Sequence, residues 1–492
     1  MNCSLPSRRA IHALALLLLC SHARCDSDSS SLPAATGTVP TFASVQALVT
    51  GGAKPGTWTP APYSTANGGP AFGLWLLTDG SLLSHGGDLH QWVKLVPDSH
   101  GNYANGAWVV LADSHYGRGA AVEQTLKDGR FLEAGGEYIY FFPPGSSAND
   151  HNSVEIYNPL TNIWTLVAPG LYGDISDSAS VMLQGGRLFT GSSANNGTQI
   201  YNPGINKWFP TAPIYGTAAE SGWVALPDNS VVAISSYVQA RYDLDSNAWT
   251  DTGPLPTGVQ FGDVGPVSRL MDGRIFVLGD HCTAIYTPGP HPYSPGSWVK
   301  GPAIPNGNDV EDVNGCGESN GRVIFPSYPV SQLNEFNPVT NKIITLPLPK
   351  AADVPLDFQT LPSGQVIATC GDLDYIWTPV GSPQDAWRPT ITSITANSDG
   401  SYTLAGTQLS GFTQTGNDDM GLAENFPIVA LADSFGHVYY ARSSQFSSMT
   451  TSAVNESQTA QFSIPSTVPR GSYQVFVTTC GVWSKTSLPL TY

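Results

Sequence analysis

The stretch Leu126-Lys-Asp-Gly129-Arg-Phe-Leu-Glu-Ala-Gly135-Gly136 decides the fold class, because variants of it recur along the chain. Each copy has a Leu or Glu, two further residues, a Gly or Asn, and then an apolar run. The Gly or Asn falls at positions 80, 129, 186, 229, 273, 321 and 364, which are 43 to 57 residues apart. This position favours a tight hairpin turn with positive φ, and the apolar run after it predicts a buried inner strand.

A second signature follows three of the seven copies in full and two others in an altered form. It has a Tyr and, seven residues later, a Trp, as in Glu155-Ile-Tyr157-Asn-Pro-Leu-Thr-Asn-Ile-Trp164 and Gln199-Ile-Tyr201-Asn-Pro-Gly-Ile-Asn-Lys-Trp208. The two aromatic residues predict an outer hairpin whose rings pack between neighbouring repeats. A repeat of about 50 residues is typical of kelch-type β-propeller blades. We therefore predict an all-β chain in which residues 42–387 form a seven-bladed kelch-type β-propeller.

The ring of blades needs a closing strand. Gly56-Thr-Trp58-Thr-Pro, before the first repeat, has the pattern of an outer strand without a partner. The last repeat has Ile376-Trp377-Thr-Pro but no evident outer strand after it. We therefore expect the early stretch to pair into the last blade, because closure removes the exposed edges of an open array.

The two ends of the chain differ from the repeats. Residues 1–23 have the basic and apolar regions of a signal peptide, and the Ser- and Asp-rich residues 24–41 are expected to be a disordered leader. Residues 388–492 are predicted to form a β-sandwich. Its strands are expected near Tyr402-Leu404, Ile428-Leu431, Val438-Ala441, Ala460-Ile464 and Ser472-Thr478. No apolar run is long enough to span a bilayer, so we expect a secreted monomer, extracellular or periplasmic.

The net charge argues against one class of partner, and the cysteine content predicts disulfides. The net charge of −17 over 492 residues argues against nucleic acid as a partner. In an oxidising compartment four of the cysteines can form two disulfides, with three pairings left open. These are Cys282, Cys316, Cys370 and Cys480.

The order of repeats and sandwich resembles that of the galactose oxidase-like proteins, which have a kelch propeller followed by an early-set immunoglobulin-like domain. The likeness covers residues 55–492 and includes the tail Ile464-Pro-Ser-Thr-Val-Pro-Arg-Gly-Ser-Tyr473. The run Gly436-His-Val-Tyr-Tyr-Ala-Arg442 is similar to one in uncharacterised exported bacterial kelch proteins. The resemblance implies the immunoglobulin-like form of the sandwich.

The copper ligands of the oxidases in this family are not matched. Those enzymes use a Tyr-His pair before a late turn, a Tyr cross-linked to a Cys, and a His from the sandwich domain. Alignment on Leu361-Pro-Ser-Gly364 places Val354-Pro355 at the Tyr-His pair, and alignment on Arg442 places Gln445 or Phe446 at the His. Without these ligands, copper binding is not expected. No cofactor is predicted, and Ca²⁺ is the one ion left open.

Acidic residues recur just before the inner hairpins, in the segments that lead to the mouth of the central channel. If the blades are equivalent, these carboxylates converge as an axial ring that binds Ca²⁺, a cationic ligand or a polyhydroxylated ligand. The alternative is that each carboxylate accepts hydrogen bonds from a neighbouring blade and only locks the ring. The residues are Asp177, Glu220, Asp263, Glu311, Asp312 and Asp357.

Two functions follow from these observations. The first is a secreted binding protein that recognises carbohydrate or a surface protein at the propeller mouth. The second is an enzyme, either an oxidoreductase related to the galactose and glyoxal oxidases or an acid/base catalyst that uses the axial carboxylates. The sequence does not decide whether the chain is an enzyme.

Overall fold

The structure is a computed structural model. It describes residues 37–63, 72–86, 89–136, 138–141, 151–350, 355–370, 373–417, 421–422 and 424–492, and the statements below refer to these. Every helix and strand belongs to one compact unit, Thr38–Tyr492.

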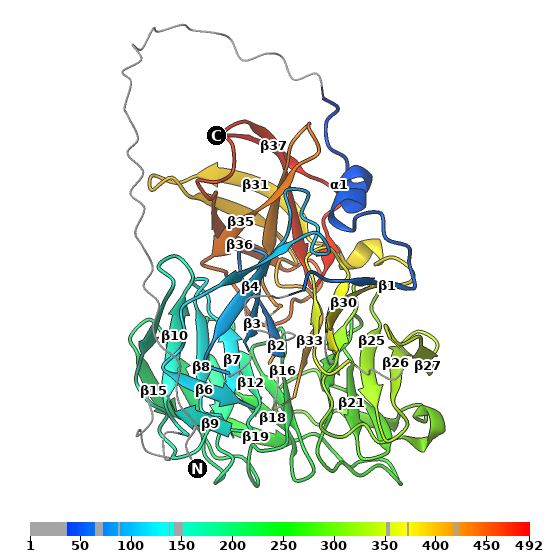
Figure 1. The fold of residues 1–492 in the computed structure, drawn as a ribbon. Helices are drawn as coiled ribbons and strands as arrows, with labels where there is room; N and C mark the ends of the chain where they lie inside the picture. Colours follow the sequence, from blue (N-terminus) through cyan, green and yellow to red (C-terminus); the bar gives the residue numbers. More distant parts are fainter. Residues whose placement is uncertain are drawn as a thin grey trace, which may run out of the picture. The chain divides into compact units, whose positions relative to one another are not determined.

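The described residues form seven sheets of a β-propeller, as the repeats predict (Figure 1). Six of these sheets follow the chain from the inner strand to the outer strand. The first three blades are β2 (Phe72–Leu76), β3 (Leu82–His85), β4 (Trp92–Val96) and β5 (Ala107–Val110); β7 (Val122–Thr125), β8 (Phe131–Ala134), β10 (Val154–Asn158) and β11 (Ile163–Leu166); and β12 (Ser180–Met182), β13 (Leu188–Gly191), β14 (Thr198–Asn202) and β15 (Lys207–Pro210).

The next three blades have the same order. They are β16 (Gly222–Ala225), β17 (Val231–Ile234), β18 (Gln239–Asp243) and β19 (Ala248–Asp251); β20 (Val267–Arg269), β21 (Ile275–Gly279), β22 (Cys282–Thr287) and β23 (Ser297–Lys300); and β24 (Cys316–Gly317), β25 (Val323–Ser327), β26 (Gln332–Asn337) and β27 (Lys342–Leu346). A short ribbon of β6 (Tyr116–Gly119) and β9 (Tyr138–Phe141) precedes and interrupts the second blade, and the 3₁₀ turn η1 (Pro305–Gly307) precedes the sixth.

The seventh blade confirms the predicted closure. It consists of β28 (Phe358–Thr360), β29 (Val366–Cys370), β30 (Leu373–Thr378) and, as outer strand, β1 (Thr57–Pro60). Trp58 lies opposite Trp377, with ring centroids 5.2 Å apart. The ring is therefore closed by a strand from the N-terminal side of the first blade, and Figure 1 shows β1 alongside β30.

In the second, third and fourth blades the recurrent Tyr and Trp lock the blade to the one before it, which confirms their predicted packing role. Tyr201 lies directly opposite Trp208 on the outer hairpin, and Trp208 Nε1 donates to the Ala168 carbonyl of the preceding blade at 2.8 Å. Asn206, at positive φ, accepts from Tyr201 Oη and from Ala168 N. The same arrangement recurs at Tyr157–Trp164 and Tyr242–Trp249.

The N-terminal helix was not predicted from the sequence. The helix α1 (Phe42–Val49) begins with a capping box in which Thr41 and Ser44 satisfy each other's backbone N–H groups. Its Val45 and Val49 are fully buried, and it contacts β35. No helix in the described ranges has the length and apolar character needed to cross a bilayer.

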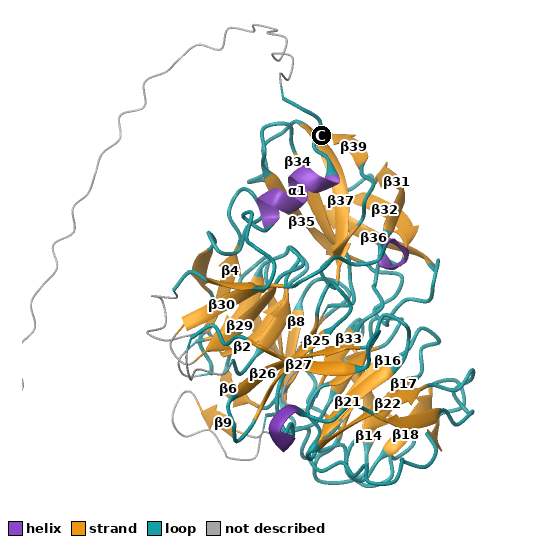
Figure 2. Ribbon diagram, turned by 90° about the vertical axis from the view of Figure 1, so that its right-hand side faces the viewer, coloured by secondary structure: helices purple, strands orange, loops and turns teal. Residues whose placement is uncertain are grey.

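The C-terminal residues form one continuous sheet in the order β31-β32-β36-β35-β34-β37-β38, with β39 also on β37 (Figure 2). The C-terminal half of β35 pairs with β36 and its N-terminal half with β34, so the sheet folds around a core that includes Leu404, Val429 and Val475. The expected strands are present. The elements are η2 (Asp385–Trp387), β31 (Thr390–Ala396), β32 (Tyr402–Thr407), β34 (Ile428–Ala432), β35 (Val438–Ser444), β36 (Ser457–Ser463), β37 (Ser472–Thr479), β38 (Val482–Trp483) and β39 (Leu488–Thr491).

Candidate functional site

The two ends of the propeller have different neighbours. The turn between the first and second strands of a blade lies at one end, and the connections into the first strand and between the second and third strands lie at the other. The C-terminal residues hydrogen-bond the first end: Ser443 N to Thr78 O at 3.1 Å, Gln445 N to Lys127 O at 2.7 Å, and Trp483 Nε1 to Pro362 O at 2.6 Å. We call this the sheet-facing end and the opposite one the distal face.

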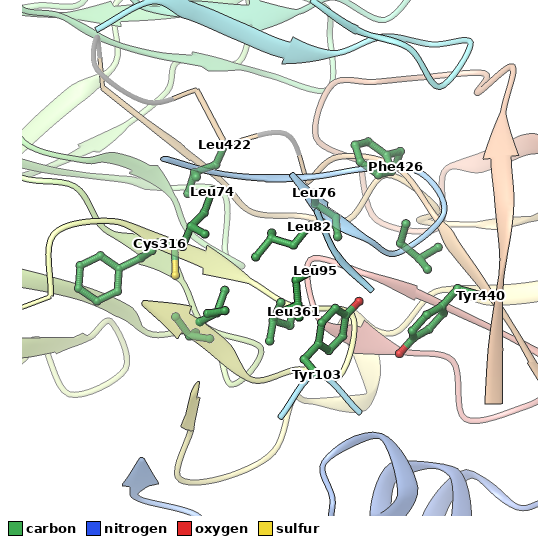
Figure 3. Packing of buried hydrophobic residues seen from close by; sticks show 14 of the residues in the cluster. Leu74, Leu76, Leu82, Leu95, Tyr103, Cys316, Leu361, Leu422, Phe426 and Tyr440 are labelled. Atoms are coloured by element: carbon green, nitrogen blue, oxygen red, sulfur yellow. The ribbon is translucent and has the colours of Figure 1, made fainter. Parts of the chain in front are cut away.

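A segment of the C-terminal region enters the central channel. The strand β33 (Gln414–Gly416) pairs with β20, the inner strand of the fifth blade, and also contacts β16 and β24. Gln414 Oε1 accepts from Ala225 N at 2.8 Å. Figure 3 shows Leu422 beside Leu74, and both belong to the main buried cluster. The described residues of this segment thus contribute backbone hydrogen bonds and the apolar side chain of Leu422 to the centre of the propeller.

The aligned copper positions hold no metal ligands. Gln445 and Phe446 lie at the sheet-facing end, where Phe446 stacks on Phe426 with ring centroids 5.5 Å apart. Pro355 is buried, and Val354 lies outside the described residues. The alignment therefore selected a segment that does not enter the channel, whereas residues 414–417 do.

Three of the six residues of the predicted axial ring have the same backbone conformation in their blades. Asp177, Glu220 and Asp312 all have positive φ, at 51°, 53° and 47°, and Ala120 has 48° at the same place in the second blade. Asp177 N donates to Ala120 O at 3.1 Å. Among the described residues, however, no compact group of metal-ligating atoms includes any of these three acids.

Asp357 accepts hydrogen bonds from neighbouring blades, as in the structural interpretation of the acidic residues. Its carboxylate is buried and accepts hydrogen bonds from Gly73 N at 3.1 Å, Asn314 Nδ2 at 2.9 Å and Thr369 Oγ1 at 3.1 Å. Burial raises the pKa of Asp357, and these hydrogen bonds oppose the increase. The side chain joins the seventh blade to the first and the sixth, so it is a structural link in the ring.

The remaining two predicted acids belong to a different group, on the distal face. Burial, followed by the charges of Asp309, Asp280 and Asp263, raises the pKa of Glu311. Ligand atoms of Asp280, His281 and Asp309 lie within 4.8 Å of one another, and His281 Nε2 is 3.5 Å from Asp280 Oδ1. We call Asp263, Asp280, His281, Asp309 and Glu311 the distal acidic cluster.

The local chain conformation builds this cluster. Asp280 and His281 form the turn between β21 and β22, with His281 at a φ of 47°. Glu311 N donates to Asp309 Oδ1 at 2.9 Å. A Cβ at Gly262 would lie 1.5 Å from Glu311 Oε1, so the Glu311 carboxylate lies directly over the backbone of this glycine. Sequence reasoning found Asp263 and Glu311 but missed two acids. Asp280 lies in the turn after a second strand, and Asp309 lies in the same connection as Glu311.

Two exposed tyrosines accompany the cluster on the distal face. Tyr215, in the connection before β16, is 67% exposed, and Tyr237, in the β17–β18 turn, is 75% exposed. A Cβ at Gly216 would lie 3.2 Å from Tyr237 Cβ, so the two loops adjoin. They belong to the fourth blade, and Asp263 lies in the connection from that blade to the fifth.

The expectation of two disulfides is not met, because no disulfide joins any of the four cysteines. Cys282 Sγ is 3.2 Å from Gln260 O, and Cys480 Sγ is 3.6 Å from Thr413 O beneath the channel segment. Cys316 is buried in the main core, and Cys370 ends the strand β29. Each thiol is packed in its own surroundings, and burial raises the pKa of Cys316 and Cys480 well above the usual range.

Comparisons with known proteins support the fold. No protein-family model matches the chain, and no curated protein matches it either. Among solved structures, the chain is similar to a fungal alcohol oxidase of the AA5 family in complex with copper, at 15% identity and a TM-score of 0.52, over 89% of this chain and 99% of that one. At this identity the likeness shows the propeller fold alone.

Two other solved structures are similar to a smaller part of the chain. One is a streptogramin B lyase, at 12% identity and a TM-score of 0.48, over 65% of this chain and 96% of that one. The other is a virginiamycin B lyase from Staphylococcus aureus, at 12% identity and a TM-score of 0.47, over 66% of this chain and 99% of that one.

Proposed function

We propose that this chain is an exported kelch-type propeller protein, with an immunoglobulin-like C-terminal sandwich, that binds carbohydrate at its distal face. The observation that carries the proposal is the combination of Tyr215 and Tyr237 with the distal acidic cluster. Flat aromatic rings stack on the apolar faces of sugar rings, and carboxylates accept strong hydrogen bonds from hydroxyl groups. A face with both features suits a polyhydroxylated ligand.

The charge of the cluster supports the same ligand. Among the described residues, no Lys or Arg forms an ion pair with Asp263, Asp280, Asp309 or Glu311, and only His281 lies beside them. Carboxylates without a Lys or Arg partner can accept hydrogen bonds from hydroxyl groups or bind a Ca²⁺ ion, which takes oxygen ligands. A Ca²⁺ ion held here would also coordinate sugar hydroxyls.

A glycan array tests the proposal. Wild-type protein and the double variant Tyr215→Ala/Tyr237→Ala are applied to the array, with Ca²⁺ and with EDTA. We expect selective binding by the wild type and loss of binding by the variant, which should fold normally because both side chains are exposed. Wild-type protein that binds no glycan in either buffer would contradict the proposal.

A further inference from the structure

A buried group of charged residues lies between the first and second blades. Glu133 on β8 lies directly opposite Glu123 on β7 and Glu155 on β10, so three glutamates share one face of the second blade. Arg118 and His85 complete the group, and all five side chains are at most 2% exposed. Like charges placed opposite one another across strands are destabilising, so these glutamates require compensation.

The charge of the Glu155 carboxylate is compensated by neighbouring protein groups. Its carboxylate accepts from His115 N at 2.9 Å and Tyr116 N at 3.1 Å, and it lies 2.6 Å from His115 Nδ1. Arg118 Nη2 is 3.4 Å from the same carboxylate. The other hydrogen bonds of this guanidinium go to Gly135 O and Ser153 Oγ.

Glu133 is left without such partners. Neither of its carboxylate oxygens makes a hydrogen bond with the described residues, and Arg118 Nε is 3.6 Å away. His85 Nε2 also has no hydrogen-bond partner there, although it lies 3.7 Å from Glu133 Oε1. A buried carboxylate and imidazole with unused polar atoms facing each other are costly, unless a further group lies between them.

The arrangement of His85 suits metal coordination. Ligand atoms of His85, Glu123 and Glu133 all lie within 4.8 Å of one another. The His85 ring is oriented by Trp92, at a centroid distance of 4.0 Å, and by Trp75, edge-on at 5.2 Å.

We propose that His85, Glu123 and Glu133 bind a divalent transition-metal ion, such as Zn²⁺ or Mn²⁺, that joins the first blade to the second. One imidazole and two carboxylates are a ligand set for such ions, whereas Ca²⁺ disfavours imidazole. The ion and Arg118 together balance the charge of the three glutamates. The site is separate from the distal acidic cluster and independent of carbohydrate binding.

Metal content is the first test. Wild-type protein, Glu133→Gln and His85→Gln are purified without chelators or affinity tags that bind metals, incubated with Zn²⁺ or Mn²⁺, desalted and measured by mass spectrometry. Glu424→Gln is the matched control, because Glu424 is likewise buried with both carboxylate oxygens lacking hydrogen bonds. We expect about one ion per chain in the wild type and the control, and less than a tenth of that in the two site variants. Wild-type protein without bound metal would overturn the proposal.

Cobalt substitution provides a signal specific to the site. Co²⁺ bound at His85 would quench the fluorescence of Trp92, whose ring lies 4.0 Å from the imidazole. We expect quenching in the wild type and Glu424→Gln but not in His85→Gln. Equal quenching in His85→Gln would place the metal elsewhere and overturn the proposal, and the wild-type and control titrations decide the matter even if a site variant does not fold.

Thermal unfolding distinguishes a metal site from an empty charged cluster. With Zn²⁺ present, wild-type Tm should rise, and Glu133→Gln should show no metal-dependent change. If no ion binds, removal of a buried like charge by Glu133→Gln should raise Tm in every buffer and Zn²⁺ should not affect the wild type. That second pattern would contradict the proposal.

Discussion

The propeller contains two groups of acidic residues that differ in burial. Glu123, Glu133 and Glu155 lie between the first two blades and are almost completely buried, and Arg118 lies among them. The distal acidic cluster lies on loops, and His281 is the only basic side chain paired with it in the described part of the chain. Water and salt screen exposed carboxylates, whereas buried carboxylates must be compensated by the fold or by a bound ion. Burial, more than residue type, therefore distinguishes the two groups, because only the buried carboxylates require compensation.

Among the variants that test this comparison, removal of the Arg118 guanidinium should cause the largest loss of stability. Arg118→Met leaves three buried glutamates without a guanidinium, and we expect it to lower the free energy of unfolding by about 3–5 kcal/mol. Urea unfolding measures the change. The matched control is Arg274→Met, whose pair with Asp272 lies at an exposed turn and should cost at most about 1 kcal/mol. If the two variants lost the same free energy of unfolding, burial would not distinguish the two groups of acidic residues.

Glu424, another buried acid, predicts how stability depends on pH. Burial raises the pKa of Glu424 from 4.5 to about 8, so the folded protein retains a proton that the unfolded chain releases. Stability should therefore fall as pH rises from about 5 to about 8, by up to about 1.4 kcal/mol per pH unit. Glu424→Gln should reduce this slope. Some slope should persist, because burial followed by the charge of Glu335 also raises the pKa of Glu318 to about 8. Thermal unfolding at several pH values tests this, and an unchanged slope would contradict it.

Asp357 should matter for stability more than Asp312, the exposed acid of the predicted ring. Asp357→Ala removes an acceptor from Gly73 N, Asn314 and Thr369, and we expect a loss of about 2 kcal/mol. Asp312→Ala, at an exposed position, should change stability by less than about 0.5 kcal/mol. Chemical denaturation of the two variants compares them. A larger loss for Asp312→Ala would contradict the structural role assigned to Asp357.

The distal acidic cluster should change ligand binding with little effect on stability. We expect wild-type protein to bind Ca²⁺ with a Kd of about 10⁻⁴–10⁻³ M, a range typical of extracellular modules. Calorimetry should show this binding lost in Asp280→Asn/Asp309→Asn and kept in Asp245→Asn, an exposed acid of the β18–β19 turn. Binding that survives in the double variant would show that the ion lies elsewhere.

The sequence predicts the parts of this fold that repeat. The turn glycines, the Tyr and Trp of the outer hairpins and Trp58 follow from local patterns, because each blade uses the same turn and the same inter-blade contacts. The channel segment at Gln414 does not repeat and was missed, and the disulfide prediction was wrong because cysteine count alone does not place thiols near one another. Residues such as Asp309 and Glu133 meet their partners only after the blades are arranged in a ring.

The affinity of the Tyr215→Ala/Tyr237→Ala variant for a glycan bound by the wild type tests the central claim most directly. Calorimetry compares it with Tyr293→Ala, which removes a tyrosine that is 67% exposed at the sheet-facing end of the fifth blade. The account predicts at least a ten-fold weaker Kd for the double variant, about 1.4 kcal/mol, and wild-type affinity for Tyr293→Ala. Unchanged affinity in the double variant would contradict carbohydrate binding at the distal face.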